Sequence, residues 1–128
     1  MLPPDTEILV VDDHDFIRKI MVDLLRTRGF TNVRTAENGD AAFAMLKQKP
    51  VDAVISDYDM PVMNGIELVK AMRNDPALRH IPVVIVSATP GLELVALSAG
   101  VDAYMPKPPK IDEVLKAIEQ AIEARKSS

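Results

Sequence analysis

Short apolar runs alternate along the chain with longer segments in which apolar residues recur every three or four positions. The short runs are typical of buried strands and lie at residues 8–11, 33–36 (the weakest), 52–56, 82–86 and 103–105. The longer segments are typical of amphipathic helices and lie at residues 17–25, 39–49, 65–73, 92–99 and 111–122. Apolar strands that alternate strictly with helices predict an α/β fold, in which helices cover both faces of a parallel sheet.

Glycine and proline residues mark the ends of several of these segments. Gly29 follows the first helical segment and Gly100 follows the fourth, where a helix is expected to stop. Pro82 stands at the first position of its strand, where the loss of one backbone donor is tolerated. No proline falls inside a predicted helix or strand, so the division into elements is self-consistent.

Polar residues gather where the predicted strands end. Parallel sheets of this kind bind their ligands beyond the C-terminal ends of the strands. The first predicted strand ends in Asp12 and Asp13, the third ends in Asp57 with Asp59 two residues on, and the fourth ends in Ser87. Lys107 comes just after the fifth. The pattern therefore predicts a site where acidic groups, a hydroxyl and an ammonium meet.

Carboxylates crowded at one edge repel one another, so they must bind a cation or take up protons. Such oxygen ligands suit Mg²⁺, which prefers one or two carboxylates together with water and phosphate oxygens. A carboxylate such as Asp57 is also a nucleophile toward phosphorus, and a metal, Lys107 and Ser87 could neutralise the transferred phosphoryl group. Taken singly, Asp13 could be a helix cap, Lys107 a surface residue and Ser87 a turn residue. Their coincidence at one edge favours the functional interpretation.

Composition narrows the function classes. The 128 residues, 48% of them hydrophobic, suit one domain with a real core, and the lack of cysteine excludes disulfides and thiolate metal sites. A net charge of −4 and a pI near 5.1 argue against direct binding of nucleic acid. No apolar run approaches the roughly 20 residues that span a bilayer, and residues 1–7 lack the pattern of a signal peptide. A cytoplasmic location without membrane association is therefore expected.

The two histidines, His14 and His80, have no metal-ligand spacing with another histidine or a cysteine. We expect His14 to be a solvated residue of the first helical turn.

Four stretches together resemble the receiver domains of two-component response regulators, the CheY-like family. They are ILVVDD at residues 8–13, ISDYDMPVMNG at 55–65, VIVSA at 84–88 and AGVDAYMPKP at 99–108. The resemblance covers nearly the whole chain and implies a doubly wound, five-stranded parallel sheet in the flavodoxin-like order 2-1-3-4-5, within three α/β/α layers. It also implies a single receiver domain over residues 1–128, ordered from about residue 6 to 125, with residues 125–128 expected to fray.

The resemblance assigns roles to the acidic residues. Asp57 matches the aspartate that is phosphorylated. Asp13 and Asp57 match direct ligands of Mg²⁺, for which Mn²⁺ can substitute, and Asp12 matches a ligand that acts mainly through water. The backbone carbonyl of Asp59 matches the third protein ligand.

The remaining roles fall on the later strands. Lys107 matches the lysine that pairs with the phosphoryl group, and Ser87 the hydroxyl that binds a phosphoryl oxygen and moves on activation. Tyr104 matches the aromatic residue that turns inward when Ser87 moves, although an ordinary exposed tyrosine would explain it too. The Lys107–Pro108 peptide bond matches one that is cis in the family.

The resemblance implies that Asp57 accepts a phosphoryl group, with Mg²⁺, from a phosphohistidine of a histidine kinase or a histidine phosphotransfer protein. The chain would catalyse only its own phosphorylation and dephosphorylation and would not otherwise be an enzyme. The new charge would change the face formed by segments 92–99, 103–105 and 111–122, which binds a downstream protein. The chain would thus be a phosphoprotein of a phosphorelay.

The segment between Ser87 and Lys107 departs from the family pattern. The two residues are 20 positions apart, which is shorter than the resemblance implies, so the helix near 92–99 is expected to be short or displaced. Its apolar residues cannot all face inward, and one or two are expected to be exposed: Leu92, Leu94, Val95 and Leu97. Scattered surface residues and a docking or homodimer patch both explain them.

Two alternatives use the same residues differently. Asp57-Tyr58-Asp59 after an apolar strand also resembles the Asp-x-Asp motif of haloacid-dehalogenase-type phosphatases. That family usually carries the motif on its first strand and needs an acidic metal motif after the lysine, where only Asp112 and Glu113 follow. An interaction module that has lost phosphorylation would lack an acceptor, metal ligand or lysine, and none is missing. The sequence leaves open whether the domain stands alone or belongs to a larger protein.

Overall fold

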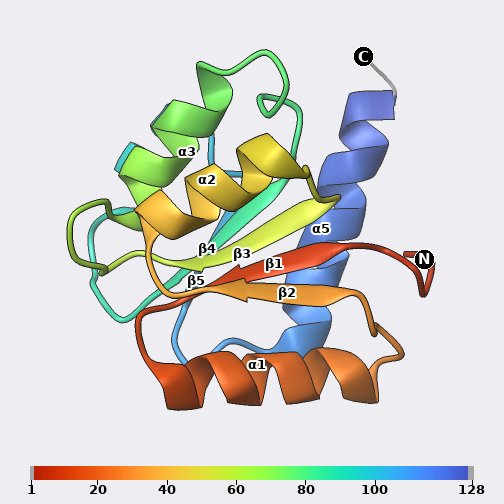
Figure 1. Ribbon diagram of the computed structural model, residues 1–128. Coiled ribbons are helices and arrows are strands. Elements are labelled where there is room, and N and C mark those ends of the chain that lie inside the picture. The colour runs from red at the N-terminus through yellow and green to blue at the C-terminus, as the bar shows by residue number, and fades with distance from the viewer. Residues whose placement is uncertain (1, 127–128) are drawn as a thin grey trace.

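The computed structural model describes residues 2–126, in which strands and helices alternate as the apolar pattern predicted (Figure 1). The strands are β1 (Ile8–Val11), β2 (Val33–Ala36), β3 (Ala53–Asp57), β4 (Val83–Ser87) and β5 (Ala103–Pro106). The helices are α1 (Asp15–Thr27), α2 (Gly39–Gln48), α3 (Gly65–Arg73), α4 (Glu93–Ala99) and α5 (Ile111–Lys126). Asp57 and Ser87 are the last residues of β3 and β4, where the sequence predicted that these strands end.

The strands of the described residues form one parallel sheet in the order β2-β1-β3-β4-β5, which confirms the fold that the resemblance implied. β3 is central, with β1 and β4 as its neighbours. The register pairs Val11 with Ser56, and Asp57 with Val86. Because the strands are parallel, the C-terminal ends of β1, β3 and β4 lie side by side at one edge, where the polar candidates are.

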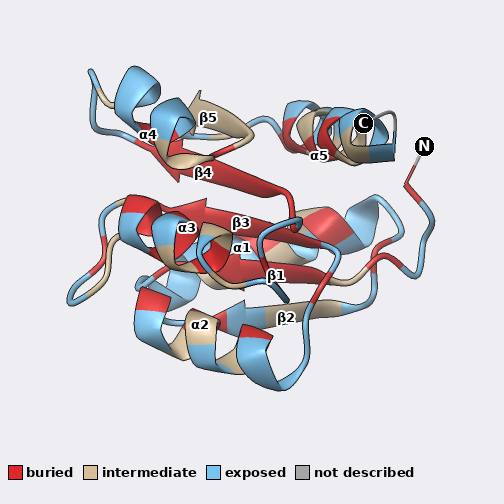
Figure 2. Ribbon diagram, turned by 90° about the horizontal axis from the view of Figure 1, so that it is seen from above, coloured by how far each residue is buried: buried red, intermediate tan, exposed pale blue. Residues whose placement is uncertain are grey.

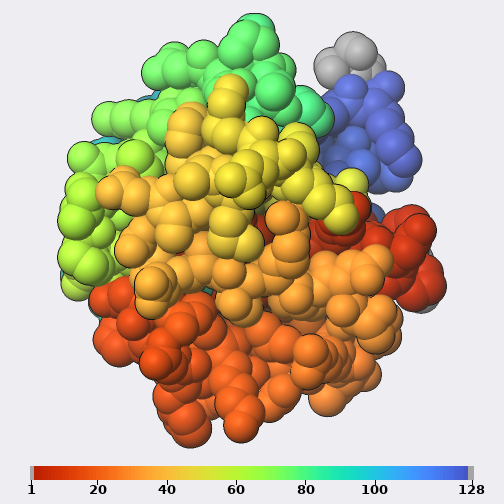
Figure 3. Space-filling model, viewed as in Figure 1, coloured from red at the N-terminus to blue at the C-terminus, as the bar shows by residue number. Residues whose placement is uncertain are grey.

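The sheet separates two apolar cores. In β1, Leu9 and Val11 point toward the core beneath α2, α3 and α4, whereas Ile8 and Val10 point toward the core beneath α1 and α5. β1, β3 and β4 are buried at every residue, and Figure 2 shows these strands as the buried layer between helices. Burial on both faces explains why these strands are continuously apolar instead of alternating. Figure 3 shows the side chains of α1 and α2 packed closely around the edge formed by β2.

The helices differ in how they begin. The Asn64 side chain accepts from the backbone of Glu67 and the Glu67 side chain accepts from the backbone of Asn64, which closes a capping box at the start of α3. At the start of α2, the side-chain oxygen of Asn38 accepts from the backbone N–H of Ala41, without the reciprocal bond of a capping box. The N-cap residue of α1 is His14, which makes no side-chain cap bond. Asp13 precedes that position, so the interpretation of Asp13 as a helix cap is wrong.

The helix α4 has seven residues, which confirms the expectation of a short helix in this segment. It ends at Gly100, whose φ of 105° is readily adopted only by glycine. Three apolar side chains are exposed instead of the expected one or two: Leu94 (79%), Val95 (52%) and Leu97 (43%). The reason is that a helix of two turns packs only a narrow face against the rest of the domain, and Ala96 is its buried residue.

The end of α5 is anchored to the start of β5. Arg125 Nη1 donates to Asp102 Oδ1 at 2.9 Å, and Arg73 Nη2 lies 3.2 Å from Asp102 Oδ2. Residues 125 and 126 form the end of α5, while 127 and 128 lie outside the described residues, and the expected fraying from Arg125 stays a prediction. Within the part of the chain that the structure describes, no helix is both long and apolar enough to cross a membrane.

A pair of leucine substitutions tests the placement of the core. Leu46 of α2 is completely buried, so Leu46→Ala should lower the free energy of unfolding by about 2–5 kcal/mol. Leu94→Ala removes the same atoms from a side chain that is 79% exposed, and it should change that free energy by less than about 0.5 kcal/mol. Urea denaturation followed by circular dichroism measures both. Equal effects of the two substitutions would contradict this packing.

Candidate functional site

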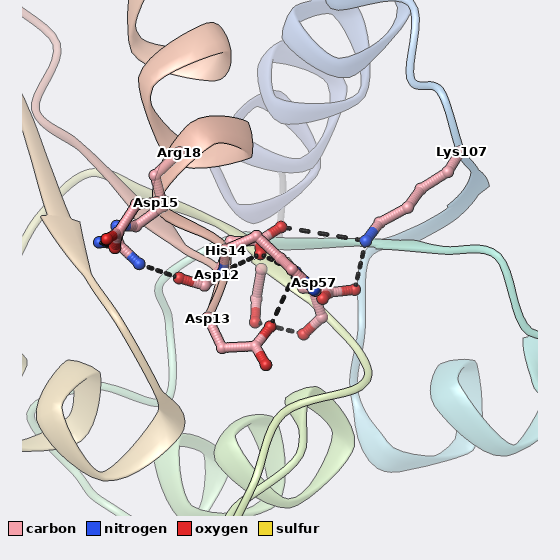
Figure 4. A network of polar contacts seen from close by, with 8 residues as sticks. Asp12, Asp13, His14, Asp15, Arg18, Asp57 and Lys107 are labelled. Carbon is pink, nitrogen blue, oxygen red and sulfur yellow. Dashed lines mark hydrogen bonds and ion pairs between the residues drawn. The ribbon is translucent and has the colours of Figure 1, made fainter.

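The predicted acidic residues and the lysine meet at the C-terminal edge of the sheet. Asp12 and Asp13 directly follow β1, Asp57 ends β3, and Lys107 follows β5. Figure 4 shows the Lys107 side chain reaching across the edge toward Asp57 and Asp12. Asp12 and Asp57 are only 5% and 4% exposed, whereas Asp13 is exposed. The site therefore joins two carboxylates that have little access to water with one that is solvated.

Lys107 pairs with one oxygen of Asp57 and leaves the other free. Its Nζ lies 3.0 Å from Asp57 Oδ1 and 3.9 Å from Asp12 Oδ2. Asp57 Oδ2 is buried and has no hydrogen-bond partner among the described residues. A buried carboxylate oxygen without a donor costs free energy. This oxygen is consequently the atom at which a cation or an electrophile would be stabilised most.

Burial raises the pKa of Asp57 above its ordinary value. The hydrogen bond and charge of Lys107 oppose that rise, and the nearby carboxylate of Asp12 adds to it. The charged form of Asp57 is therefore disfavoured in the folded protein, even though Lys107 is in contact with it. A site with this imbalance gains from any additional positive charge.

His14 is the N-cap residue of α1 and its side chain is 62% exposed, as expected of a solvated residue at the start of that helix, but its ring also lies against the acidic pair. Its backbone N–H donates to Asp12 Oδ1 at 2.8 Å, and its ring Nδ1 lies 3.0 Å from the same oxygen and 3.1 Å from Asp13 Oδ1. The hydrogen bond to Asp12, followed by the charge of Asp13, raises the pKa of His14. Sequence spacing could not reveal this contact, because it depends on the chain turning between β1 and α1.

Arg18 fixes the same turn from the other side. Its Nη1 donates to the backbone carbonyl of Asp12 at 2.6 Å, and its guanidinium also pairs with Asp15 (Figure 4). Arg18 comes from the second turn of α1. The turn that presents Asp12 and His14 is thus held by both the backbone and a helix side chain.

Ser87 and Tyr104 are linked through Thr89. Ser87 is buried, and its Oγ accepts from the backbone N–H of Thr89 at 2.9 Å. The Tyr104 hydroxyl donates to the backbone carbonyl of Thr89 at 2.8 Å. A cavity of about 260 Å³ opens between Ser87 and the acidic residues, and Asp57 and Lys107 also line it. The structure thus brings Ser87 to the site, whereas Tyr104 is connected to Ser87 only through Thr89.

Two backbone features shape the loops around Asp57. A Cβ on Gly65 would lie 2.5 Å from the carbonyl oxygen of Asp57, so only glycine lets the start of α3 approach β3 this closely. Gly65 also donates its N–H to the carbonyl of Tyr58 at 2.8 Å, which closes the loop that carries Asp59. The Lys107–Pro108 bond is cis, the isomer that the resemblance implied.

The residues present fit a divalent cation. Asp12, Asp13, His14 and Asp57 each offer one ligand atom, and these atoms lie within 4.8 Å of one another. Carboxylate oxygens are the ligands that Mg²⁺ prefers, and the unpartnered Oδ2 of Asp57 is buried beside them. The backbone of Asp59 belongs to the loop that borders the same cavity.

Comparisons with known proteins agree on one family. The family model described as response regulator receiver domain matches residues 8–119. Chemotaxis protein CheY-3 of Vibrio cholerae is 41% identical over 110 residues, which cover 84% of this chain and 85% of that protein. Chemotaxis protein CheY of Pseudomonas aeruginosa is 39% identical over 119 residues, which cover 91% of this chain and 96% of that protein.

Solved structures give the same answer. Chemotaxis response regulator CheY4 of Vibrio cholerae superposes with a TM-score of 0.80 at 29% identity, over 91% of this chain and 98% of that one. The receiver domain of a sensor histidine kinase from Pseudomonas aeruginosa has a TM-score of 0.82 at 26% identity, over 93% of this chain and 98% of that one. That receiver domain was solved with a magnesium ion coordinated in its active site cleft.

The raised pKa of Asp57 predicts a stability effect. Because the folded state disfavours the charged carboxylate, Asp57→Asn should increase the free energy of unfolding at pH 7. The gain should shrink as the pH falls through the raised pKa and should vanish below the pKa of the unfolded chain, where wild-type Asp57 is neutral in both states. Urea denaturation at a series of pH values, without divalent cations, measures it. A variant that is less stable than wild type at pH 7 would show that Lys107 outweighs burial.

Proposed function

The chain belongs to the response regulator receiver domain family, and from that premise we propose that Asp57 accepts a phosphoryl group from a phosphohistidine. The CheY-like relatives place the domain in two-component signalling. One observation carries the proposal: Asp57 is a buried carboxylate with one oxygen paired to Lys107 and the other without a partner. A group held in this way is positioned, only partly neutralised and open to an electrophile.

The transfer balances without any further reactant. A lone pair on a carboxylate oxygen of Asp57 forms the new oxygen–phosphorus bond. The nitrogen–phosphorus bond of the phosphohistidine breaks, and its electrons return to the imidazole of the donor protein. Lys107, whose Nζ is 3.0 Å from Asp57 Oδ1, can then pair with the negatively charged phosphoryl oxygens. The Ser87 hydroxyl, which lines the same cavity, can donate to one of those oxygens.

Magnesium fits this site, with manganese as a substitute. Asp13 and Asp57 would hold the ion directly, Asp12 through water, and Asp59 through its backbone carbonyl. When bound, the ion supplies positive charge that offsets the crowded carboxylates and the phosphoryl oxygens. The buried Oδ2 of Asp57 and the magnesium-bound receiver domain from Pseudomonas aeruginosa support this assignment.

Phosphorylation would be reported through Ser87, Thr89 and Tyr104. If the Ser87 hydroxyl turns to the phosphoryl group, its bond to the Thr89 N–H is lost. Thr89 also holds the Tyr104 hydroxyl through its carbonyl, so a shift of Thr89 releases Tyr104. The face of α4, β5 and α5 would then present a different surface to a downstream protein.

The partners follow from this role. The phosphoryl donor is a histidine kinase or a histidine phosphotransfer protein, and the recipient of the signal is a protein bound at the face of α4, β5 and α5, either another protein or a second copy of this chain. The chain acts on itself and turns over no external substrate. Its location in the cytoplasm stays a prediction from the sequence. Hydrolysis of p-nitrophenyl phosphate would instead favour the phosphatase alternative.

Incubation with acetyl phosphate tests the acceptor directly. With Mg²⁺, intact-protein mass spectrometry should show wild type gaining the mass of one phosphoryl group, in an adduct that is stable in acid and labile in base. EDTA should reduce the yield by at least about tenfold, because the carboxylates then lack the charge that the metal supplies.

Two variants complete that experiment. Asp57→Asn should gain no such mass, whereas Asp40→Asn, which neutralises an exposed acidic residue at the start of α2, should behave as wild type. Undiminished phosphorylation of Asp57→Asn would move the acceptor elsewhere. No adduct on wild type, with or without Mg²⁺, would contradict the proposed function as a whole.

A further inference from the structure

The imidazole of His14 lies where a metal held by the acidic residues would find a nitrogen ligand. Its Nδ1 is 3.0 Å from Asp12 Oδ1 and 3.1 Å from Asp13 Oδ1. All three atoms, with an oxygen of Asp57, fall within 4.8 Å of one another. Figure 4 includes the contacts of His14 with Asp12 and Asp13.

We propose that His14 Nδ1 is a further ligand of the divalent cation, which makes this site favour transition-metal ions over Mg²⁺ more strongly than carboxylates alone would. The proposal rests on the proposed function, because it concerns the same metal site. Oxygen ligands suit Mg²⁺, whereas imidazole nitrogen is a better ligand for ions such as Co²⁺, Ni²⁺ and Zn²⁺. The function assigned to the site above uses oxygen ligands only.

The spacing of the ligand atoms supports a shared ion. An octahedral ion with metal–ligand distances of about 2.1 Å separates neighbouring ligand atoms by about 3.0 Å. The distance of 3.1 Å from His14 Nδ1 to the oxygen of Asp13, the member of the acidic pair assigned as a direct ligand, is close to that length. Within this cluster, Asp57 Oδ2 lies buried without a hydrogen-bond partner among the described residues, on a side chain that is 3% exposed. Positive charge next to that atom would be stabilising.

The ring of His14 contacts Asp12 and Asp13 but takes no part in capping α1. As the N-cap residue of α1, His14 makes no side-chain cap bond, so the imidazole has no structural duty to the helix. Its side chain is 62% exposed, so neighbouring residues leave the ring room to turn toward an ion. Its backbone is held by the N–H bond to Asp12.

A simpler arrangement makes the opposite prediction. If the ring only lies against Asp12 and Asp13 as a hydrogen-bonding neighbour, it must leave when a cation arrives. Removing it would then strengthen the binding of every divalent ion, Mg²⁺ included. If His14 is a ligand, removing it weakens binding, and the loss is larger for Co²⁺ than for Mg²⁺.

Pulsed EPR of the Mn²⁺-loaded protein gives the decisive readout. Wild type should show coupling between Mn²⁺ and a histidine nitrogen, identified by its change on labelling with ¹⁵N-histidine. The coupling should disappear in His14→Ala and in His14→Asn, which keeps a residue favoured at the N-cap. It should persist in His80→Ala, which removes the other histidine from a loop.

Calorimetric titrations give the energetic counterpart. His14→Ala should lower the affinity for Co²⁺ by about tenfold or more, and that for Mg²⁺ by less than about threefold. Thermal unfolding of the variants confirms that they are folded. Mn²⁺ binding without histidine coupling, or higher Mg²⁺ affinity in His14→Ala, would overturn this inference and leave the proposed function intact. Failure of wild type to bind Mn²⁺ or Mg²⁺ would overturn both.

Discussion

The structure depends on an electrostatic imbalance at the end of β3. Asp57 and Asp12 are buried side by side, and the ammonium of Lys107 contacts one oxygen of Asp57 while lying further from Asp12. Burial raises the pKa of Asp57 despite that contact. A carboxylate kept under these conditions is destabilised in its charged form and would be stabilised by a nearby cation. The fold can accommodate this unfavourable burial because the two apolar cores on either side of the sheet stabilise it.

The sheet order creates the imbalance. In a parallel sheet with β1 and β4 on either side of β3, the residues that end these strands must lie side by side. Asp12, Asp57 and Ser87 therefore share one edge, and the loop after β5 delivers Lys107 to them. Because Gly65 has no Cβ, the start of α3 can lie close to the Asp57 carbonyl. Core packing and site chemistry are thus the outcome of one topology.

The same edge connects to β5 through two hydrogen bonds. Ser87, Thr89 and Tyr104 are joined by two hydrogen bonds, so a change at the site has a short route to β5. Next to that route, α4 is only seven residues long and leaves Leu94, Val95 and Leu97 exposed. Arg73 and Arg125 hold Asp102 at the opposite end of β5. A change at Ser87 would therefore be expected to move Thr89 first, and the C-terminal end of α4 only afterwards.

The sequence by itself determined the elements, the parallel sheet and the residues at its edge. Apolar periodicity records which faces are buried, and the four motifs that resemble receiver domains supplied the strand order and the roles of Asp57 and Lys107. Only the tertiary structure decided that Lys107 contacts Oδ1 and leaves Oδ2 without a partner, that His14 lies against Asp12 and Asp13, and that Arg125 is anchored. The reason is physical: periodicity fixes the face on which a side chain lies, but distances between atoms from separate elements depend on register and loop path.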